Sequence, residues 1–251
     1  MKNHFIIAYT GNKREEVEII YKNIKIDDNI EYIVEPFCGS SSLSYYISLQ
    51  NPKKYKYVLN DNDPFLIELY KIMKDEILFK NFIEKINNIC FVDGIFIDKI
   101  QYNNIKKENN IYSYFIQNKF YNIRPGLYPI RIKKPLIYEN ILKTPIINFL
   151  RTEEIILYND DAINILEKYN KPNNIILLDP PYMNCNGNSM YNNANLNIYE
   201  HIIDKTFNNT YLIVENNWII KLLCKNKEHF IYEKTYNGLR KKKVNHIIIK
   251  L

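Results

Sequence analysis

Two patterns of apolar residues alternate along most of this chain. Short apolar runs at residues 32–34, 55–59, 154–158, 175–178 and 211–214 are typical of buried strands. Between them, residues 17–24, 43–49, 65–73, 162–169, 198–207 and 218–223 repeat apolar positions every three or four residues, which predicts helices. Strands that alternate with helices form parallel sheets with helices on both faces. The pattern therefore predicts an α/β fold.

The run at 175–178 is the centre of the predicted sheet, since four consecutive apolar residues require burial on both faces. It ends at Asp179, because Pro180 and Pro181 lack the N–H group that a strand ladder needs. Open α/β sheets bind ligands at the carboxyl ends of their strands. Asp179, the proline carbonyls and Tyr182 would offer a carboxylate, an acceptor and an aromatic face to a planar base with an amine. The alternative is a proline-stiffened turn with a surface tyrosine.

The alternation fails between residues 74 and 152, which predicts an inserted subdomain. Residues 79–100 have a helical pattern, and the segment 115–138 interleaves cations with aromatic rings. Its candidate nucleic-acid-binding residues are Lys119, Tyr121, Arg124, Tyr128, Arg131, Lys133 and Lys134. After the insertion, runs at 230–236 and 244–249 are joined by a short basic turn, which predicts an antiparallel hairpin at a sheet edge.

Composition and charge narrow the class of protein. The net charge of +6 and the pI near 8.8 permit a polyanionic partner without requiring one. The four cysteines form no closely spaced pair, so neither a zinc site nor a disulfide framework is expected. No apolar run approaches the ~20 residues of a membrane span. We expect a soluble intracellular protein without a bound metal.

Polar residues follow the other predicted strands as well. Glu35 comes at the end of one strand, before Gly39 and three serines that would cap the next helix. Because Glu35 would repel a phosphate, this turn favours a ligand with a cationic amine or free hydroxyls; a simple helix cap is the alternative. Asp61 is placed to accept hydrogen bonds from ribose hydroxyls. Asp63 and Pro64 are a helix start, as N-cap and first residue.

Two further positions leave alternatives open. Lys13 follows a glycine turn in TGNK and is by itself an ordinary surface lysine. Asp160 and Asp161 close the strand at 154–158, where either residue could meet a ligand or cap the following helix.

Together these motifs resemble one family. TGNK, EPFCGSSS, LNDNDPFLIELY, a basic insertion, LYNDDAINIL and DPPY follow each other as in the Dam-like DNA N6-adenine methyltransferases. NKFYNIRPGLY and the closing GLRKKKVNHIIIKL are similar to that family's recognition segment and last hairpin. Ser41 stands where the family usually has a second glycine, and Asn12 stands where it usually has GGK.

The resemblance implies the fold and the division of the chain. We expect a Rossmann-like seven-stranded methyltransferase sheet with an antiparallel C-terminal hairpin and an inserted, mostly helical target-recognition subdomain. Residues 1–75 and 153–251 would bind the cofactor, and residues 76–152 would recognise the target.

The resemblance also implies the site residues. Residues of the S-adenosyl-L-methionine site would be Tyr9, Lys13, Glu35, Pro36, Phe37, Gly39, Ser40, Ser41, Asp61, Asn62, Asp161 and Asp179. Asp179, Pro180, Pro181 and Tyr182 would hold the target base. Asp179 and the Pro180 carbonyl would accept the N6 hydrogens of an adenine flipped from double-stranded DNA, with Tyr182 stacked on it.

Other functions remain open from the sequence. An RNA methyltransferase or a protein-amide methyltransferase could use the same corner. A nucleic-acid-binding relative without catalysis is a further alternative, which Ser41 and Asn12 suggest. A cognate restriction endonuclease would be a partner if the chain belongs to a restriction–modification system. The target sequence and the oligomeric state are not encoded in any motif.

Overall fold

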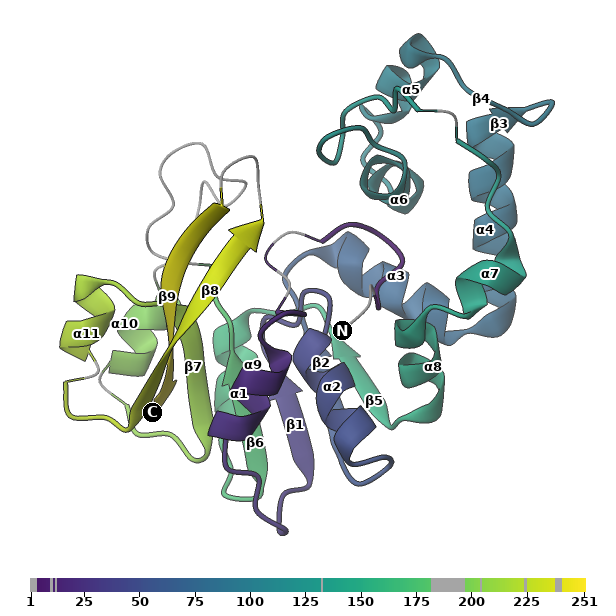
Figure 1. Cartoon of the computed structure of the whole chain (residues 1–251). Coiled ribbons are helices and arrows are strands. Elements are labelled where there is room, and N and C mark those ends of the chain that lie inside the picture. Colours follow the sequence, from purple (N-terminus) through teal and green to yellow (C-terminus); the bar gives the residue numbers. More distant parts are fainter. Residues whose placement is uncertain are drawn as a thin grey trace. The chain divides into compact units, whose positions relative to one another are not determined.

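The structure is a computed structural model that describes residues 4–9, 11, 13–131, 133–181, 197–203, 205–223, 225–237 and 241–251. The chain divides into two compact units (Figure 1). We call them the helical unit, Met1–Arg14 with Asp63–Glu153, and the sheet unit, Glu15–Asn62 with Glu154–Leu251.

A seven-stranded sheet with the order β5-β2-β1-β6-β7-β9-β8 forms the centre of the sheet unit. The strands β5, β2, β1, β6 and β7 are parallel, whereas β9 is antiparallel to both of its neighbours. Their bounds are β1 Tyr32–Glu35, β2 Lys56–Asn60, β5 Ile155–Tyr158, β6 Asn174–Leu178, β7 Thr210–Glu215, β8 His229–Asn237 and β9 Lys241–Lys250. The predicted Rossmann-like sheet and its antiparallel C-terminal hairpin are confirmed.

Helices cover the sheet on both faces, which explains the continuous apolar runs of its strands. Val34, Val58 and Ile176 point to one face, where they form a core with α9, α10 and α11. The alternate residues Ile33 and Ile175 are fully buried towards the other face, on which α1 and α2 lie (Figure 1). These helices are α1 Val17–Asn23, α2 Ser42–Gln50, α9 Ala162–Tyr169, α10 Asn197–Ile203 and α11 Trp218–Leu223. The expected helix at 198–207 thus ends at residue 203.

Short helices dominate the helical unit, as expected for the insertion. They are α3 Pro64–Lys74, α4 Glu76–Cys90, α5 Lys99–Ile105, α6 Ile111–Lys119, α7 Tyr138–Leu142 and α8 Pro145–Thr152. The predicted start of α3 is confirmed, because the Asp63 carboxylate accepts hydrogen bonds from the N–H groups of Phe65 and Leu66. Pro64 occupies the first turn of the helix.

The helical pattern expected at 79–100 is confirmed for residues 79–90 and is wrong for residues 91–96. Helix α4 ends at Cys90, and an antiparallel hairpin follows, β3 Phe91–Val92 with β4 Ile95–Phe96. Asp93 and Gly94 form its turn with φ of 50° and 78°. Two positive φ values are what a tight hairpin turn requires, and Asp-Gly is its favoured sequence. The prediction relied on the apolar periodicity of the segment and missed the Asp-Gly turn signal.

The N-terminal segment belongs to the helical unit. The N–H of Ala8 donates to the carbonyl of Asn118, and the carbonyl of His4 accepts from the N–H of Ile146. The ring of Phe5 packs on Tyr70 with 5.5 Å between centroids. These contacts place the segment before Lys13 with the insertion rather than with the sheet.

The compact units differ from the predicted division in where they group residues 1–14 and 63–75, which pack with the helices. The assignment of 1–75 with 153–251 to the cofactor and of 76–152 to the target is functional and stays a prediction. No helix among the described ranges has the length and apolar character that a membrane crossing needs.

Candidate active site

The carboxyl ends of the five parallel strands meet at one edge of the sheet unit. Strands β1 and β6 are neighbours there, while the chain continues from β1 towards β2 on the other side. This reversal of strand order is the switch point at which open α/β sheets bind ligands. The residues at this edge are Glu35–Ser41 at the end of β1, Asp61 and Asn62 after β2, Asp160 and Asp161 after β5, and Asp179–Pro181 after β6.

Glu35 caps helix α2 from the tip of β1. Its Oε1 accepts a hydrogen bond from the N–H of Ser44 at 2.9 Å, in a buried position. A carboxylate at a helix N-terminus also interacts favourably with the helix dipole. A serine, Ser41, is the N-cap residue as expected, but its side chain makes no capping bond.

Ser41 has a left-handed backbone, with φ 50° and ψ 37°. Glycine adopts this conformation readily, whereas other residues are strained in it. The position where the resembling family usually has a glycine therefore keeps the glycine conformation in this chain. Ser40 and Ser42 bond to each other through their hydroxyls at 2.9 Å, and all three serines are buried.

Asp61 ties the tip of β2 to the turn after β1. Its Oδ2 accepts from the N–H of Gly39 at 3.0 Å, and its side chain is only 8% exposed. Cys38 lies beside this contact. Burial first, and then the negative charges of Asp61 and Glu35, raise the pKa of the Cys38 thiol well above its usual value. The neighbouring Asn62 is exposed.

Asn60 joins three strand tips, a role that the sequence reasoning missed. Its amide nitrogen donates to the carbonyls of Pro36 at 2.9 Å and Asp160 at 3.0 Å, and its Oδ1 accepts from the N–H of Asp160 at 2.9 Å. The backbone carbonyl of Asn60 accepts from the N–H of Cys38. Asn60 is fully buried, so these bonds cannot be replaced by water. The sequence did contain one signal for this role, since Asn60 is a polar residue directly after the apolar residues 57–59 of its strand.

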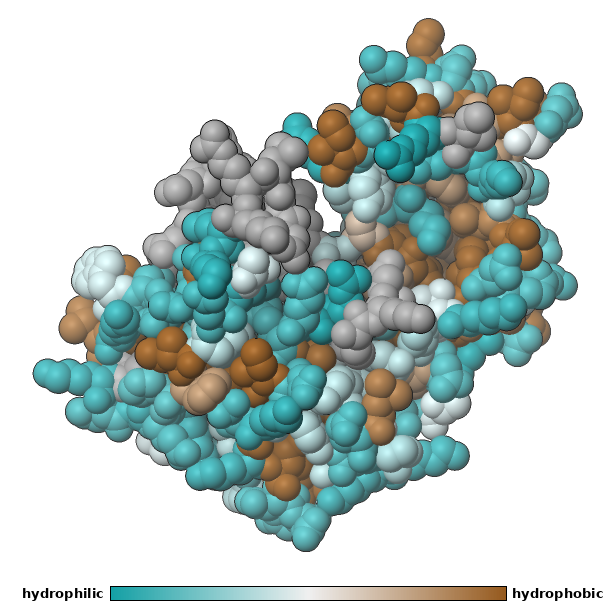
Figure 2. Space-filling model, in the orientation of Figure 1, coloured by the Kyte–Doolittle hydropathy of each residue, from teal (hydrophilic) through white to brown (hydrophobic). Residues whose placement is uncertain are grey.

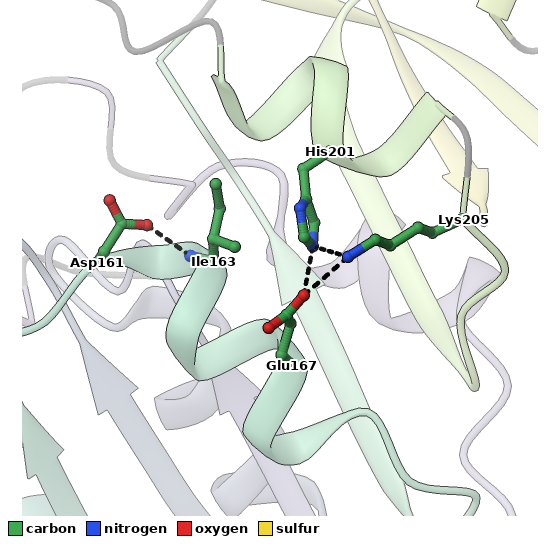
Figure 3. A network of polar contacts seen from close by, with 5 residues as sticks. All are labelled: Asp161, Ile163, Glu167, His201 and Lys205. Carbon is green, nitrogen blue, oxygen red and sulfur yellow. Dashed lines mark hydrogen bonds and ion pairs between the residues drawn. The ribbon is translucent and has the colours of Figure 1, made fainter.

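Asp160 and Asp161 accept hydrogen bonds mainly from the local backbone and from α9. Asp161 is the N-cap of α9, since its Oδ1 accepts from the N–H of Ile163 at 2.8 Å (Figure 3). Asp160 accepts from the side chain of Asn164 and from the N–H of Asp161, and these bonds lower its pKa. Of the two alternatives left open, the capping role of Asp161 is therefore observed.

The corner after β6 begins at Asp179, as predicted. Every residue of β6 is buried, and the strand ends at Leu178. Pro180 is buried, whereas Asp179 and Pro181 are half-buried. The carbonyl of Pro181 accepts a hydrogen bond from the hydroxyl of Tyr199 at 3.0 Å, a contact with no signal in the sequence. The predicted base-stacking residue, Tyr182, lies outside the described residues.

The other predicted cofactor residues are divided between the units. Tyr9 and Lys13 belong to the helical unit, and Asn12 lies outside the described residues. In the sheet unit, Phe37 packs against the core from the tip of β1.

The predicted nucleic-acid-binding residues of the helical unit differ in exposure. Lys119 donates through Nζ to the carbonyl of Ile6 at 2.7 Å, and burial lowers its pKa. Tyr128 donates to the carbonyl of Ile97 and packs edge-on against Tyr102. Lys133 donates to the carbonyl of Tyr121 at 3.4 Å. The exposed members of the predicted set are Arg124, Arg131 and Lys134.

Exposed apolar side chains accompany these cations. Figure 2 shows hydrophobic atoms scattered among hydrophilic ones on the surface of the helical unit. The most exposed is Ile123, at 86%, beside Arg124, followed by Ile130, at 79%, beside Arg131. The segment thus presents alternating apolar and cationic side chains to solvent.

The chemistry of the strand tips limits the ligands that they could hold. Glu35, Asp61, Asp160, Asp161 and Asp179 place carboxylates at one edge. Such a donor set fits a ligand with cationic groups and hydroxyls and disfavours a phosphate. Among the described residues, no group of three or more histidine, cysteine, aspartate or glutamate side chains is arranged to hold a metal ion.

Comparison with known proteins agrees with this geometry. The family model of D12 class N6 adenine-specific DNA methyltransferases matches residues 9–140, more than half of the 251-residue chain. No curated protein matches the chain at a significant level. The matched range includes the tips of β1 and β2 and most of the helical unit. The chain belongs to the D12 class N6 adenine-specific DNA methyltransferase family.

Proposed function

We propose that this protein transfers a methyl group from S-adenosyl-L-methionine to N6 of an adenine that has been flipped out of double-stranded DNA. The observation that carries the proposal is the Asp179-Pro180-Pro181 corner at the sheet's switch point, beside the acidic tip of β1, whose other neighbour is the acidic tip of β2. Family membership supplies the reaction class, adenine methylation of DNA.

The strand tips support the choice of cofactor. S-adenosyl-L-methionine supplies an electrophilic methyl group on a positively charged sulfur, and it also carries an ammonium group and ribose hydroxyls. Asp61 would accept from the ribose hydroxyls, and the backbone turn at Gly39 would allow close approach. Glu35 and Asp161 would hold the first turns of α2 and α9, which they cap, in position beside the cofactor. Tyr9 and Lys13 would complete the site from the N-terminal segment.

Asp179 and Pro180 would activate the target amine. The N6 lone pair of adenine is delocalised into the ring, so the amine is a poor nucleophile. Acceptance of its two hydrogens by the Asp179 carboxylate and the Pro180 carbonyl would favour a pyramidal nitrogen with an available lone pair. Pro180 and Pro181 carry no N–H, so no backbone donor at these positions competes for the acceptors. N6 would form a bond to the methyl carbon as the bond from that carbon to sulfur breaks, which would leave S-adenosyl-L-homocysteine, and the proton lost by N6 would pass to the Asp179 carboxylate. Positioning and electrostatic stabilisation would lower the barrier to this step.

The helical unit would hold the DNA. Arg124, Arg131 and Lys134 are exposed cations suited to phosphates, which fix the register of a protein on DNA without reading its sequence. The exposed Ile123 and Ile130 beside them suit insertion next to a base step, a device that proteins use to unstack DNA. Tyr182 would stack on the flipped adenine.

The test is methyl transfer from radiolabelled S-adenosyl-L-methionine to duplex DNA of varied sequence. We expect label at N6 of adenine, and we expect Asp179→Ala to abolish it while calorimetry still detects cofactor binding. RNA and protein substrates in parallel reactions separate this function from the alternatives. Cofactor binding without transfer to any DNA, or transfer to RNA or protein amides only, would refute the proposal.

A further inference from the structure

Tyr199 links helix α10 to the corner that is proposed to hold the target amine. Its hydroxyl donates to the Pro181 carbonyl at 3.0 Å, and the residue is only 1% exposed. Ile198 and Ile202, on the same helix, are buried in the core that contains Leu178, the last residue of β6. The phenol is therefore held from a packed helix and not from a surface loop.

A polar contact also joins α9 to His201 of α10 and to Lys205 just after it (Figure 3). Glu167 of α9 accepts from Lys205 at 2.7 Å and lies 3.3 Å from Nε2 of His201. The hydrogen bond from Lys205 lowers the pKa of Glu167. Because Asp161 caps the start of the same α9, one helix connects a strand tip of the proposed cofactor site to the helix that bears Tyr199.

The chemistry of the corner gives this contact a consequence. Asp179, Pro180 and Pro181 offer successive carbonyls, and an amine with two hydrogens needs one of them in addition to the carboxylate. A buried phenol that donates to the Pro181 carbonyl fixes the plane of that peptide group and occupies one acceptor. The orientation of the corner, and with it that of the Asp179 carboxylate and the Pro180 carbonyl proposed to accept from the amine, then depends on this bond.

We propose that Tyr199 is a positioning residue, which orients the Asp179–Pro181 corner by holding the Pro181 carbonyl. This inference rests on the proposed function, because it assigns a role within the same site. Tyr199 acts through Pro181 and has no direct role in methyl transfer.

The test compares Tyr199→Phe with Tyr211→Phe. Both variants remove one buried phenol oxygen. The hydroxyl of Tyr211 accepts from the N–H of Lys25 and not from any group of the corner, although Tyr211 pairs with Leu177 on the neighbouring strand. We expect Tyr199→Phe to lower kcat about tenfold, with an unchanged dissociation constant for S-adenosyl-L-methionine. Tyr211→Phe should keep the wild-type kcat even where thermal unfolding shows lower stability.

A second readout does not depend on activity. In protein labelled with ¹³C at the proline carbonyls, Tyr199→Phe should shift the Pro181 resonance, assigned with Pro181→Ala, and Tyr211→Phe should leave it in place. An unshifted Pro181 resonance, or equal losses of kcat in the two variants, would overturn the positioning role. A wild-type protein that methylates no DNA would overturn the proposed function instead, and the carbonyl shift would still decide whether Tyr199 holds the corner.

Discussion

The backbone N–H of Gly39 donates to the carboxylate of Asp61, with 3.0 Å between the nitrogen and Oδ2. This bond closes the gap between the tips of β1 and β2, in a position where both residues are buried. Asp61 was expected as a ligand residue for ribose hydroxyls, and it is at the same time a structural residue of the turn. A substitution at this position must be designed to separate the two roles.

Asp61→Asn and Asp61→Ala make that separation. The asparagine oxygen still accepts from the Gly39 N–H, although without the charge, so we expect the free energy of unfolding to fall by no more than about 1 kcal/mol. Alanine leaves a buried donor without a partner and should cost about 1–3 kcal/mol. Chemical denaturation measures both values. Calorimetry should show weaker S-adenosyl-L-methionine binding in both variants, and unchanged binding in Asp61→Asn would contradict a role for the carboxylate charge.

Ser41→Gly should stabilise the protein. Ser41 has a φ of 50°, where a residue with a Cβ atom is strained and glycine is not. We expect the free energy of unfolding to rise by up to about 1 kcal/mol, less whatever the buried hydroxyl contributes. Ser41→Val is the matched contrast, because a β-branched residue tolerates this conformation least. Denaturation of the three proteins decides the matter, and a Ser41→Gly variant less stable than Ser41→Val would show that backbone strain is not the controlling factor.

Cys90 should be unreactive in the folded protein. Burial raises the pKa of its thiol to about 12, so at pH 8 only roughly one thiol in ten thousand would be ionised. Mass spectrometry after treatment with iodoacetamide should show no label on Cys90 until denaturant unfolds the chain. Rapid labelling of Cys90 under native conditions would be inconsistent with its buried position.

The same shift fixes the sign of a pH effect on stability. A thiol with a raised pKa in the folded state holds its proton while the unfolded chain loses it, so the folded state binds more protons above pH ~9. The free energy of unfolding should therefore fall as the pH rises from about 9 towards 12. Cys90→Ala, which removes the titrating group, should flatten this dependence although it also leaves a small cavity. The comparison requires urea denaturation at several alkaline pH values.

Local signals were enough to predict some elements with nearly correct bounds. The helix expected at 162–169 is α9, and the start of α3 at Asp63 and Pro64 is as expected. In both cases the capping residue and the apolar positions are close together in the chain. The capping bond and the apolar face of the helix can therefore be predicted from a short stretch of sequence. The hairpin at Phe91–Phe96 was missed although its Asp-Gly turn is also local, because the surrounding apolar spacing fits a helix equally well.

The sequence by itself determined the sheet, the edge at which its polar residues gather, and the family, since these depend on periodicity and on short motifs such as DPPY. Only the tertiary structure decided what the polar groups do: Glu35 caps α2, Asn60 joins three strand tips, and Tyr199 holds the Pro181 carbonyl. A buried polar group must find a partner, and the fold brings that partner from anywhere in the chain. Spacing along the sequence carries no information about such pairs, because Asn60 and Asp160 are 100 residues apart and still share two hydrogen bonds.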